Sequence, residues 1–270
     1  LLTIVLFGLL ALVPVAARAE AEGVVRYGVT PTSLQNDFFE NNNDSDKSYG
    51  ELGYRPARLT GYVDGGQVRY FTRWVKNTDG RAWKGYFGKT LAEFDSIFYT
   101  LRDQGYHMID TSGYETPNGV RFAMLWEKTN STPGWKIYRN TSLAGMQTLH
   151  DTIGQDGWVP YRVEGYELSG QSFYTSLWYY QPGKGYYIHS HMTREQYDDK
   201  LAEYKANDYI PHHLHAHTVG NTVWYSAIWK YTTKSYEVRS NRNWRVFQRY
   251  YNNNWATGYN IDNFYAAATP

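Results

Sequence analysis

A repeat of about 52 residues constrains the fold of this chain more than any other feature. Four similar segments end in a tryptophan, at Trp74, Trp126, Trp178 and Trp229. Another aromatic residue stands 20 positions before each of them, at Tyr54, Tyr106, Trp158 and Tyr209. A fixed period of this kind is typical of chains built from copies of one supersecondary unit. Because every copy needs the same side chain at the same place, we predict that the four tryptophans are core residues.

Each copy reads as a helix followed by antiparallel strands. Residues that accept hydrogen bonds from free amides at a helix start recur at Thr90, Ser142, Thr193 and Asn243. The predicted helices end at Gly105, Gly157, Asp208 and Gly258, positions suited to the left-handed conformation that closes a helix. Two strands then flank a turn rich in glycine and asparagine, and a third strand follows around segments such as "WKGYF" and "WKIYR".

The sequence therefore predicts an α+β protein of tandem repeats, each a helix plus a three-stranded antiparallel sheet, in a pseudo-symmetric array or a closed ring. A single unit cannot bury its own apolar face, whereas stacked neighbours can. The predicted copies span residues 33–88, 89–140, 141–191 and 192–241, with a partial fifth copy at 242–266. Together they form a single repeat domain over residues 24–266.

Residues 1–19 are predicted to be a secretory signal peptide. An apolar run ends at Ala16, and the tripeptide Ala17–Ala19 that follows has the small residues that signal peptidase recognises. A transmembrane anchor is the alternative, but the run is short for a membrane span and contains Pro14. We therefore expect a secreted protein, extracellular or periplasmic, that has no membrane attachment after cleavage of the signal.

Composition narrows the possible partners. The 27 basic residues nearly balance the 26 acidic ones, which argues against nucleic acid as a partner. There is no cysteine, so disulfide cross-links and cysteine-bound zinc are excluded. Aromatic residues make up 18% of the chain, which indicates either an aromatic core or a sugar-binding surface.

The repeated pattern resembles that of a known family. Residues 53–76 read "GYRPARLTGYVDGGQVRYFTRWVK", and the same order of aromatic residue, Gly-rich turn and tryptophan follows in three more copies. Over residues 24–266 this pattern is similar to the bacterial tandem repeat domain family. The resemblance implies the N-terminal repeat module of secreted serine hydrolases related to class C β-lactamases, such as the fungal polyglycine hydrolases. It also implies that the chemistry belongs to a separate, covalently linked hydrolase domain.

The sequence carries no catalytic signature of the common kinds. The Ser-x-x-Lys motif that supplies the nucleophile of such hydrolases does not occur, nor do Lys-Thr-Gly, Gly-x-Ser-x-Gly or His-Glu-x-x-His. We therefore predict no catalytic residue here, and a non-catalytic role as an accessory or binding module of an extracellular hydrolase system, toward a protein or a glycan. Two alternatives stay open. One is a fragment of a secreted β-lactamase-like serine hydrolase whose catalytic domain lies beyond residue 270, and the other is a carbohydrate-binding module.

Candidate ligand-binding residues come from two sources. Aligning the copies puts four residues in one polar column: Arg58, Asp110, Arg162 and His213. We expect this face to be solvated, or to line a groove or a central channel. Sugar rings stack on exposed aromatic side chains, so aromatic residues outside the repeated columns are the second source. They are Trp83 and Trp135, shared by two copies, and Tyr179, Tyr180, Tyr186, Tyr187, Trp244 and Trp255.

Four histidines fall within "PHHLHAHTVG", residues 211–220. His213, His215 and His217 alternate along a predicted strand, so they share one face. Imidazoles at positions i and i+2 of a strand can chelate Zn²⁺, which makes these three candidate metal ligands. The alternative is that they replace polar residues of an already polar column and bind no metal. No other cofactor is predicted.

Overall fold

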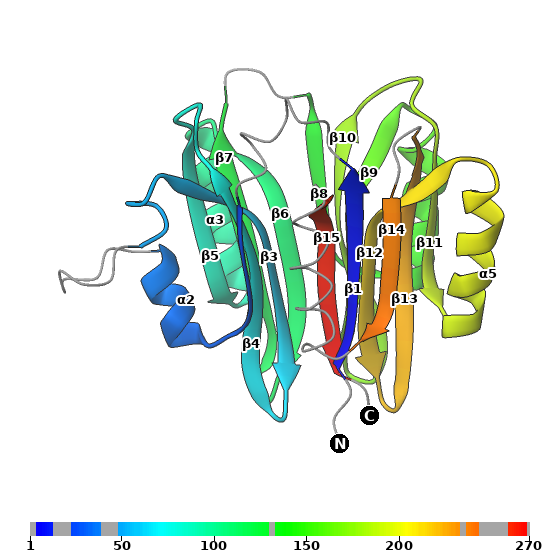
Figure 1. The fold of residues 1–270 in the computed structure, drawn as a ribbon, viewed down its shortest axis with the longest axis horizontal. Helices are drawn as coiled ribbons and strands as arrows, with labels where there is room; N and C mark the ends of the chain where they lie inside the picture. The colour runs from blue at the N-terminus through cyan, green and yellow to red at the C-terminus, as the bar shows by residue number, and fades with distance from the viewer. Residues whose placement is uncertain are drawn as a thin grey trace. The chain divides into compact units, whose positions relative to one another are not determined.

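One unit of a strand, a helix and a hairpin occurs four times in the computed structural model (Figure 1). The structure describes residues 4–12, 23–38, 48–129, 133–232, 236–242 and 259–268. In each copy the second hairpin strand is the centre of a three-stranded antiparallel sheet. Its neighbours are the first hairpin strand and the strand that precedes the helix. The predicted fold class, α+β repeats with a helix and a three-stranded antiparallel sheet, is therefore confirmed.

The four repeats divide between two compact units. Repeats 1 and 2 belong to residues 14–132, whereas repeats 3 and 4 belong to residues 133–270 together with residues 1–13. Repeats 1 and 2 consist of β2 (Gly23–Val29), α2 (Pro31–Phe38), β3 (Tyr54–Asp64), β4 (Gln67–Lys76), β5 (Ala82–Lys89), α3 (Leu91–Asp103), β6 (His107–Thr116) and β7 (Gly119–Lys128). Repeats 3 and 4 consist of β8 (Trp135–Ser142), α4 (Leu143–Thr152), β9 (Trp158–Leu168), β10 (Gln171–Tyr180), β11 (Tyr186–Met192), α5 (Arg194–Lys205), β12 (Tyr209–Val219) and β13 (Thr222–Tyr231).

The boundary between copies lies one strand earlier than the sequence suggested. We assigned the strand around "WKGYF" to the end of the first copy, after its hairpin. In the structure this strand is β5, and it pairs with β7 of the second copy, with Lys84 opposite Trp126. A period of about 52 residues is the same wherever the count begins, so the sequence could not show which hairpin the third strand joins.

The predicted helix starts are confirmed where the structure describes them. Thr90, Ser142 and Thr193 are the N-caps of α3, α4 and α5, and each side chain accepts a hydrogen bond from the amide three residues later. The segments that close these helices contain Gly105, Gly157 and Asp208, whose φ angles are 80°, 84° and 60°. The equivalent residues of the fifth copy, Asn243 and Gly258, lie outside the described residues.

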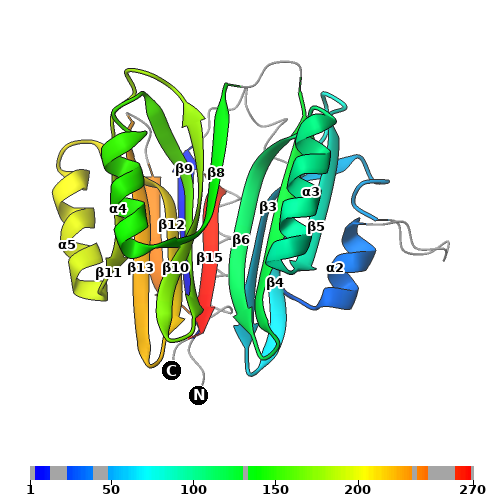
Figure 2. The ribbon, with the colours of Figure 1, turned by 180° about the vertical axis from the view of Figure 1, so that it is seen from behind.

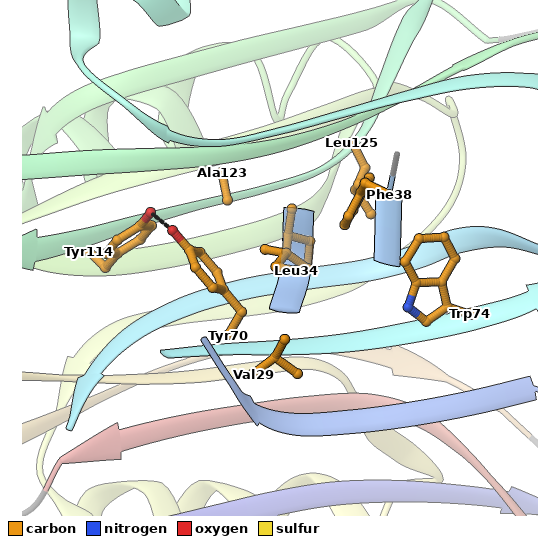
Figure 3. Packing of buried hydrophobic residues seen from close by; sticks show 9 residues of the cluster. Val29, Leu34, Phe38, Tyr70, Trp74, Tyr114, Ala123 and Leu125 are labelled. Atoms are coloured by element: carbon orange, nitrogen blue, oxygen red, sulfur yellow. Dashed lines mark hydrogen bonds between the residues drawn. The ribbon is translucent and has the colours of Figure 1, made fainter. Parts of the chain in front are cut away.

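The repeated tryptophans are confirmed as core residues, because Trp74, Trp126, Trp178 and Trp229 are all 0% exposed. Figure 2 shows α3 and α4 lying on the faces of their own sheets. The core is also shared between neighbouring copies. In the cluster drawn in Figure 3, the hydroxyls of Tyr70 in repeat 1 and Tyr114 in repeat 2 lie 2.7 Å apart. Phe38 of α2 packs edge-on against Trp74, with ring centroids 4.9 Å apart.

A fifth sheet combines the two ends of the chain. Its strands are β14 (Tyr236–Arg242), β1 (Ile4–Leu12) and β15 (Tyr259–Ala268), and β1 pairs antiparallel with both others. The strand β1 therefore takes the central place that a second hairpin strand takes in the other sheets. It falls within the segment predicted to be a signal peptide, and that assignment stays a prediction. Among the described residues, no helix has both the length and the apolar character needed to cross a membrane.

Candidate functional site

The polar column predicted from the aligned copies is buried. Arg58, Asp110, Arg162 and His213 are 8%, 1%, 0% and 2% exposed. The prediction that this face is solvated, or lines a groove or a channel, is therefore wrong. The strand pattern showed correctly that these side chains share a face, but it could not show that a neighbouring repeat covers that face. A ligand-binding role for these four residues stays a prediction.

In repeats 1 and 2 the column meets the free edge of a sheet. The strand β3 is an edge strand, and its outward amides need acceptors. The amide of Leu59 donates to Asp110 Oδ2 at 2.9 Å, and the amide of Gly61 donates to Ser112 Oγ at 3.2 Å. Burial raises the pKa of Asp110 to about 6, against the nearby Arg58 guanidinium, which lowers it. The polar side chains thus satisfy the backbone of the preceding copy.

In repeats 3 and 4, histidines form the corresponding hydrogen bonds with the backbone of the preceding copy. The amide of Gly165 donates to His215 Nδ1 at 3.2 Å, and His213 Nε2 donates to the carbonyl of Val163 at 3.0 Å. His213 and His215 thus take the places of Asp110 and Ser112 against edge strand β9. The histidine-rich segment therefore forms the same kind of contact between successive repeats that Asp110 and Ser112 form, with different side chains.

The third position of this face holds a tyrosine in three copies and His217 in the fourth. The tyrosine hydroxyls accept from a backbone amide of the strand before the helix, in the pairs Gly28–Tyr62 (3.1 Å), Gly88–Tyr114 (3.0 Å) and Asn140–Tyr166 (3.1 Å). His217 turns instead to repeat 3, where its Nε2 lies 2.8 Å from Ser172 Oγ.

Around His217 lies a group that we call the histidine cluster: Ser172, Tyr174, His191 and His217. Ser172 Oγ lies between His217 Nε2, at 2.8 Å, and His191 Nδ1, at 3.1 Å. The Tyr174 hydroxyl is 3.3 Å from the same His191 nitrogen, and the His191 ring stacks on Trp224 with centroids 3.7 Å apart. Sequence reasoning missed Ser172 and Tyr174, because no motif marks either residue.

A serine between two imidazoles raises the question of nucleophilic catalysis. An activated serine needs a base that is itself held in place by a third group. His217 Nδ1 has no hydrogen-bond partner among the residues that the structure describes. Burial also lowers the pKa of His217 to about 3, far below the range in which an imidazole is an effective general base near neutral pH. The cluster therefore has the geometry of a packing contact between repeats.

The predicted zinc ligands are not brought together into a site. His213 and His215 are bonded to the backbone of repeat 3, and the rings of His215 and His217 lie 6.4 Å apart. Within the described ranges, no group of three or more histidine, aspartate and glutamate side chains is placed to hold a metal ion. His189, one strand earlier, is 2.7 Å from the Tyr204 hydroxyl.

The two predicted tryptophans lie at half-buried positions of edge strands. Trp83 packs edge-on against Phe38, at 5.7 Å, and against Trp74, at 5.8 Å, so it closes the core of repeat 1. Trp135 pairs with Tyr179 at the start of β8. Their role in ligand binding stays a prediction.

Comparison with known families finds a model that matches most of the chain. The family model described as polyglycine hydrolase-like structural repeat matches residues 21–77, 80–129, 132–181 and 183–232. Each match after the first begins just before the strand that precedes the helix, in agreement with the sheets. No curated protein matches this sequence. With four tandem matches in phase with its four repeats, the chain belongs to the family of polyglycine hydrolase-like structural repeats.

Proposed function

We propose that this chain is a secreted, non-catalytic repeat module that serves an extracellular hydrolase system as a binding or accessory domain. The observation that carries the proposal is that its buried polar side chains form hydrogen bonds with the backbone of a neighbouring repeat. Asp110, Ser112, His213 and His215 bind backbone groups of the preceding repeat, so they build the array. The relation of the family to polyglycine hydrolases supports a link to a hydrolase, and the apolar N-terminal run supports secretion.

An activity-based probe for serine hydrolases tests the non-catalytic part of this proposal. We expect a fluorophosphonate probe to leave the native chain unlabelled, because burial lowers the pKa of His217, and its Nδ1 has no orienting partner in the part of the chain that the structure describes. The variant Ser172→Ala and the heat-denatured chain are the controls. Labelling of the native chain that disappears in Ser172→Ala would overturn the proposal.

The second candidate is that this chain is a fragment of a secreted β-lactamase-like serine hydrolase. The family description favours it, since it names a hydrolase. In that case the gene would continue past Pro270 into a domain with a Ser-x-x-Lys motif. Sequencing the gene downstream of the Pro270 codon tests this candidate. A stop codon directly after Pro270 would contradict the hypothesis that the chain is a fragment of such a hydrolase.

A further inference from the structure

The aromatic residue that begins each hairpin has a lysine beside it in repeats 1 to 3. The ammonium of Lys76 lies 3.9 Å from the centroid of the Tyr54 ring. Lys84 and Lys128 both lie 5.7 Å from the ring of Tyr106. In repeat 3 the ammonium of Lys136 lies 4.1 Å from Trp158. These are cation–π contacts, in which the ammonium and its apolar stem cover the ring.

Repeat 4 has tyrosines at both of the positions that these lysines occupy, whereas repeat 2 has lysines at both and repeats 1 and 3 have one lysine each. In the sheet register, Tyr187 stands opposite Trp229, as Lys84 stands opposite Trp126 and Lys136 opposite Trp178. Tyr231 comes two residues after Trp229, as Lys76 and Lys128 come two residues after their tryptophans. Among the described residues, no lysine or arginine lies over the rings of Tyr187, Tyr209 and Tyr231.

These substitutions leave aromatic rings at the surface, in a group that we call the tyrosine rim: Tyr187, Tyr209 and Tyr231. Behind the rim lies Tyr204, which is 6% exposed and has the Lys200 ammonium 5.5 Å from its ring centroid. Tyr187 stacks on Tyr204 with centroids 4.3 Å apart and planes at 11°, and it meets Tyr209 edge-on at 4.9 Å. Tyr209 in turn meets Tyr231 edge-on at 5.9 Å. Tyr187 is 43% exposed and Tyr231 is 60% exposed, so two open rings flank a half-buried one.

We propose that the tyrosine rim binds a neutral oligosaccharide. A sugar ring has an apolar face of C–H groups, which stacks on an aromatic ring, and an edge of hydroxyls, which a tyrosine hydroxyl can bind. The rings of Tyr187 and Tyr204 are already stacked, and Tyr204 is anchored by His189, so little side-chain freedom is lost on binding. Repeats 1 and 2 cover the same aromatic position with lysine, which leaves repeat 4 as the copy with open rings on both flanks.

The inference rests on the proposed binding function and specifies its ligand class and its site. Isothermal titration calorimetry of the full chain with cellohexaose, and separately with the hexamer of N-acetylglucosamine, tests it. We expect the wild-type chain to bind at least one of the two. The double variant Tyr187→Lys/Tyr231→Lys should bind at least tenfold more weakly. It introduces the lysines that repeat 2 has at both positions, Lys84 and Lys128, so the fold is expected to accept it.

Two control variants separate the loss of ring stacking from the effects of removing any exposed tyrosine or a tyrosine hydroxyl. Tyr99→Ala removes a tyrosine of similar exposure, 51%, from α3 in the other compact unit, and it should bind as the wild type does. Tyr231→Phe keeps the ring and removes the hydroxyl, and it should retain most of the affinity. Binding of neither sugar by the wild type, or equal binding by the double lysine variant, would overturn the inference. Neither result bears on the serine-probe test, so failure of the site is distinguishable from failure of the proposed function.

Discussion

At the scale of single residues, the four core tryptophans differ in how their indole N–H groups are satisfied. Trp74 donates to Thr72 Oγ1 at 3.1 Å, and Trp178 donates to Ser176 Oγ at 2.9 Å. Trp229 is equally buried, but its Nε1 has no hydrogen-bond partner in the described part of the chain. The residue two positions before it is Ala227, where the two satisfied copies have a hydroxyl.

We predict that Ala227→Ser stabilises the protein by about 1 kcal/mol, because the new hydroxyl accepts from the Trp229 indole. Urea denaturation measures the change in the free energy of unfolding. The control is Ala216→Ser, which buries a hydroxyl on the neighbouring strand without an indole to bond and should lower stability. A loss of stability in Ala227→Ser as large as that in the control would contradict the prediction.

A second single-residue effect concerns the turn that closes α5. Asp208 has a φ of 60°, whereas the equivalent Gly53, Gly105 and Gly157 have φ angles of 78° to 84°. A residue with a Cβ is strained in this region, so we expect Asp208→Gly to raise the free energy of unfolding by about 0.5 kcal/mol. Thermal unfolding measures it. Asp208→Ala should be less stable than the wild type, and a glycine variant no better than this alanine variant would refute the argument.

At the scale of elements, close approach between repeats depends on glycine. A Cβ at Gly165 on β9 would overlap the ring of His217 on β12, and a Cβ at Gly61 would overlap Tyr114 in the same way. We predict that Gly165→Ala costs about 1–3 kcal/mol, because the facing strands must move apart. Denaturant unfolding provides the value. Gly185→Ala is the matched control, since its added Cβ has the Tyr209 hydroxyl as its nearest neighbour, at 3.7 Å.

The same pair of elements makes stability depend on pH. Burial lowers the pKa of both His215 and His217 to about 3. Repulsion between imidazolium charges adds to this shift, from His217 on His215 and from His191 on His217. The unfolded chain therefore binds more protons than the folded chain between pH 3 and 6.5, and stability falls as the pH drops below 6.5. Each histidine contributes a loss of about 1.4 kcal/mol per pH unit in that window. Glu164 Oε2, 3.8 Å from His215 Nε2, moderates the loss when His215 is protonated.

The double variant His215→Ser/His217→Tyr tests this dependence, because Ser112 and Tyr114 occupy these places in repeat 2. We expect its unfolding free energy to decline less steeply than that of the wild type between pH 6.5 and pH 5. Other carboxyl groups and histidines titrate in both chains, so the difference between the two curves isolates these side chains. Parallel curves would show that the buried imidazoles do not control acid stability.

At the scale of the whole molecule, the repeat made much of the fold predictable from the sequence. The period, the core tryptophans and the helix caps follow from residue types that local physics requires at each copy, such as Thr90 and Gly105. Two features could not be predicted. Alternation along a strand places His213 and His215 on one face but does not show what covers that face, and the period does not show where a copy begins. Both depend on contacts between copies, which a single sequence does not record.

The N-terminal segment has two assignments that exclude each other in one molecule. As strand β1, residues 4–12 form the centre of the fifth sheet. As part of a signal peptide, they would be removed by cleavage after Ala19. Cleavage would leave β14 and β15 on either side of an empty strand position, with the amides and carbonyls that now pair with β1 exposed.

We therefore predict that a chain lacking residues 1–19 loses hydrogen-exchange protection in β14 and β15, because both strands pair with β1. The strands β12 and β13 pair with each other within repeat 4, so their amides should stay protected and provide the internal control. Exchange measured by mass spectrometry on the full and shortened chains makes the comparison. Equal protection of β15 in the two chains would show that β1 does not hold the centre of the sheet, and residues 4–12 would then be free to act as a signal.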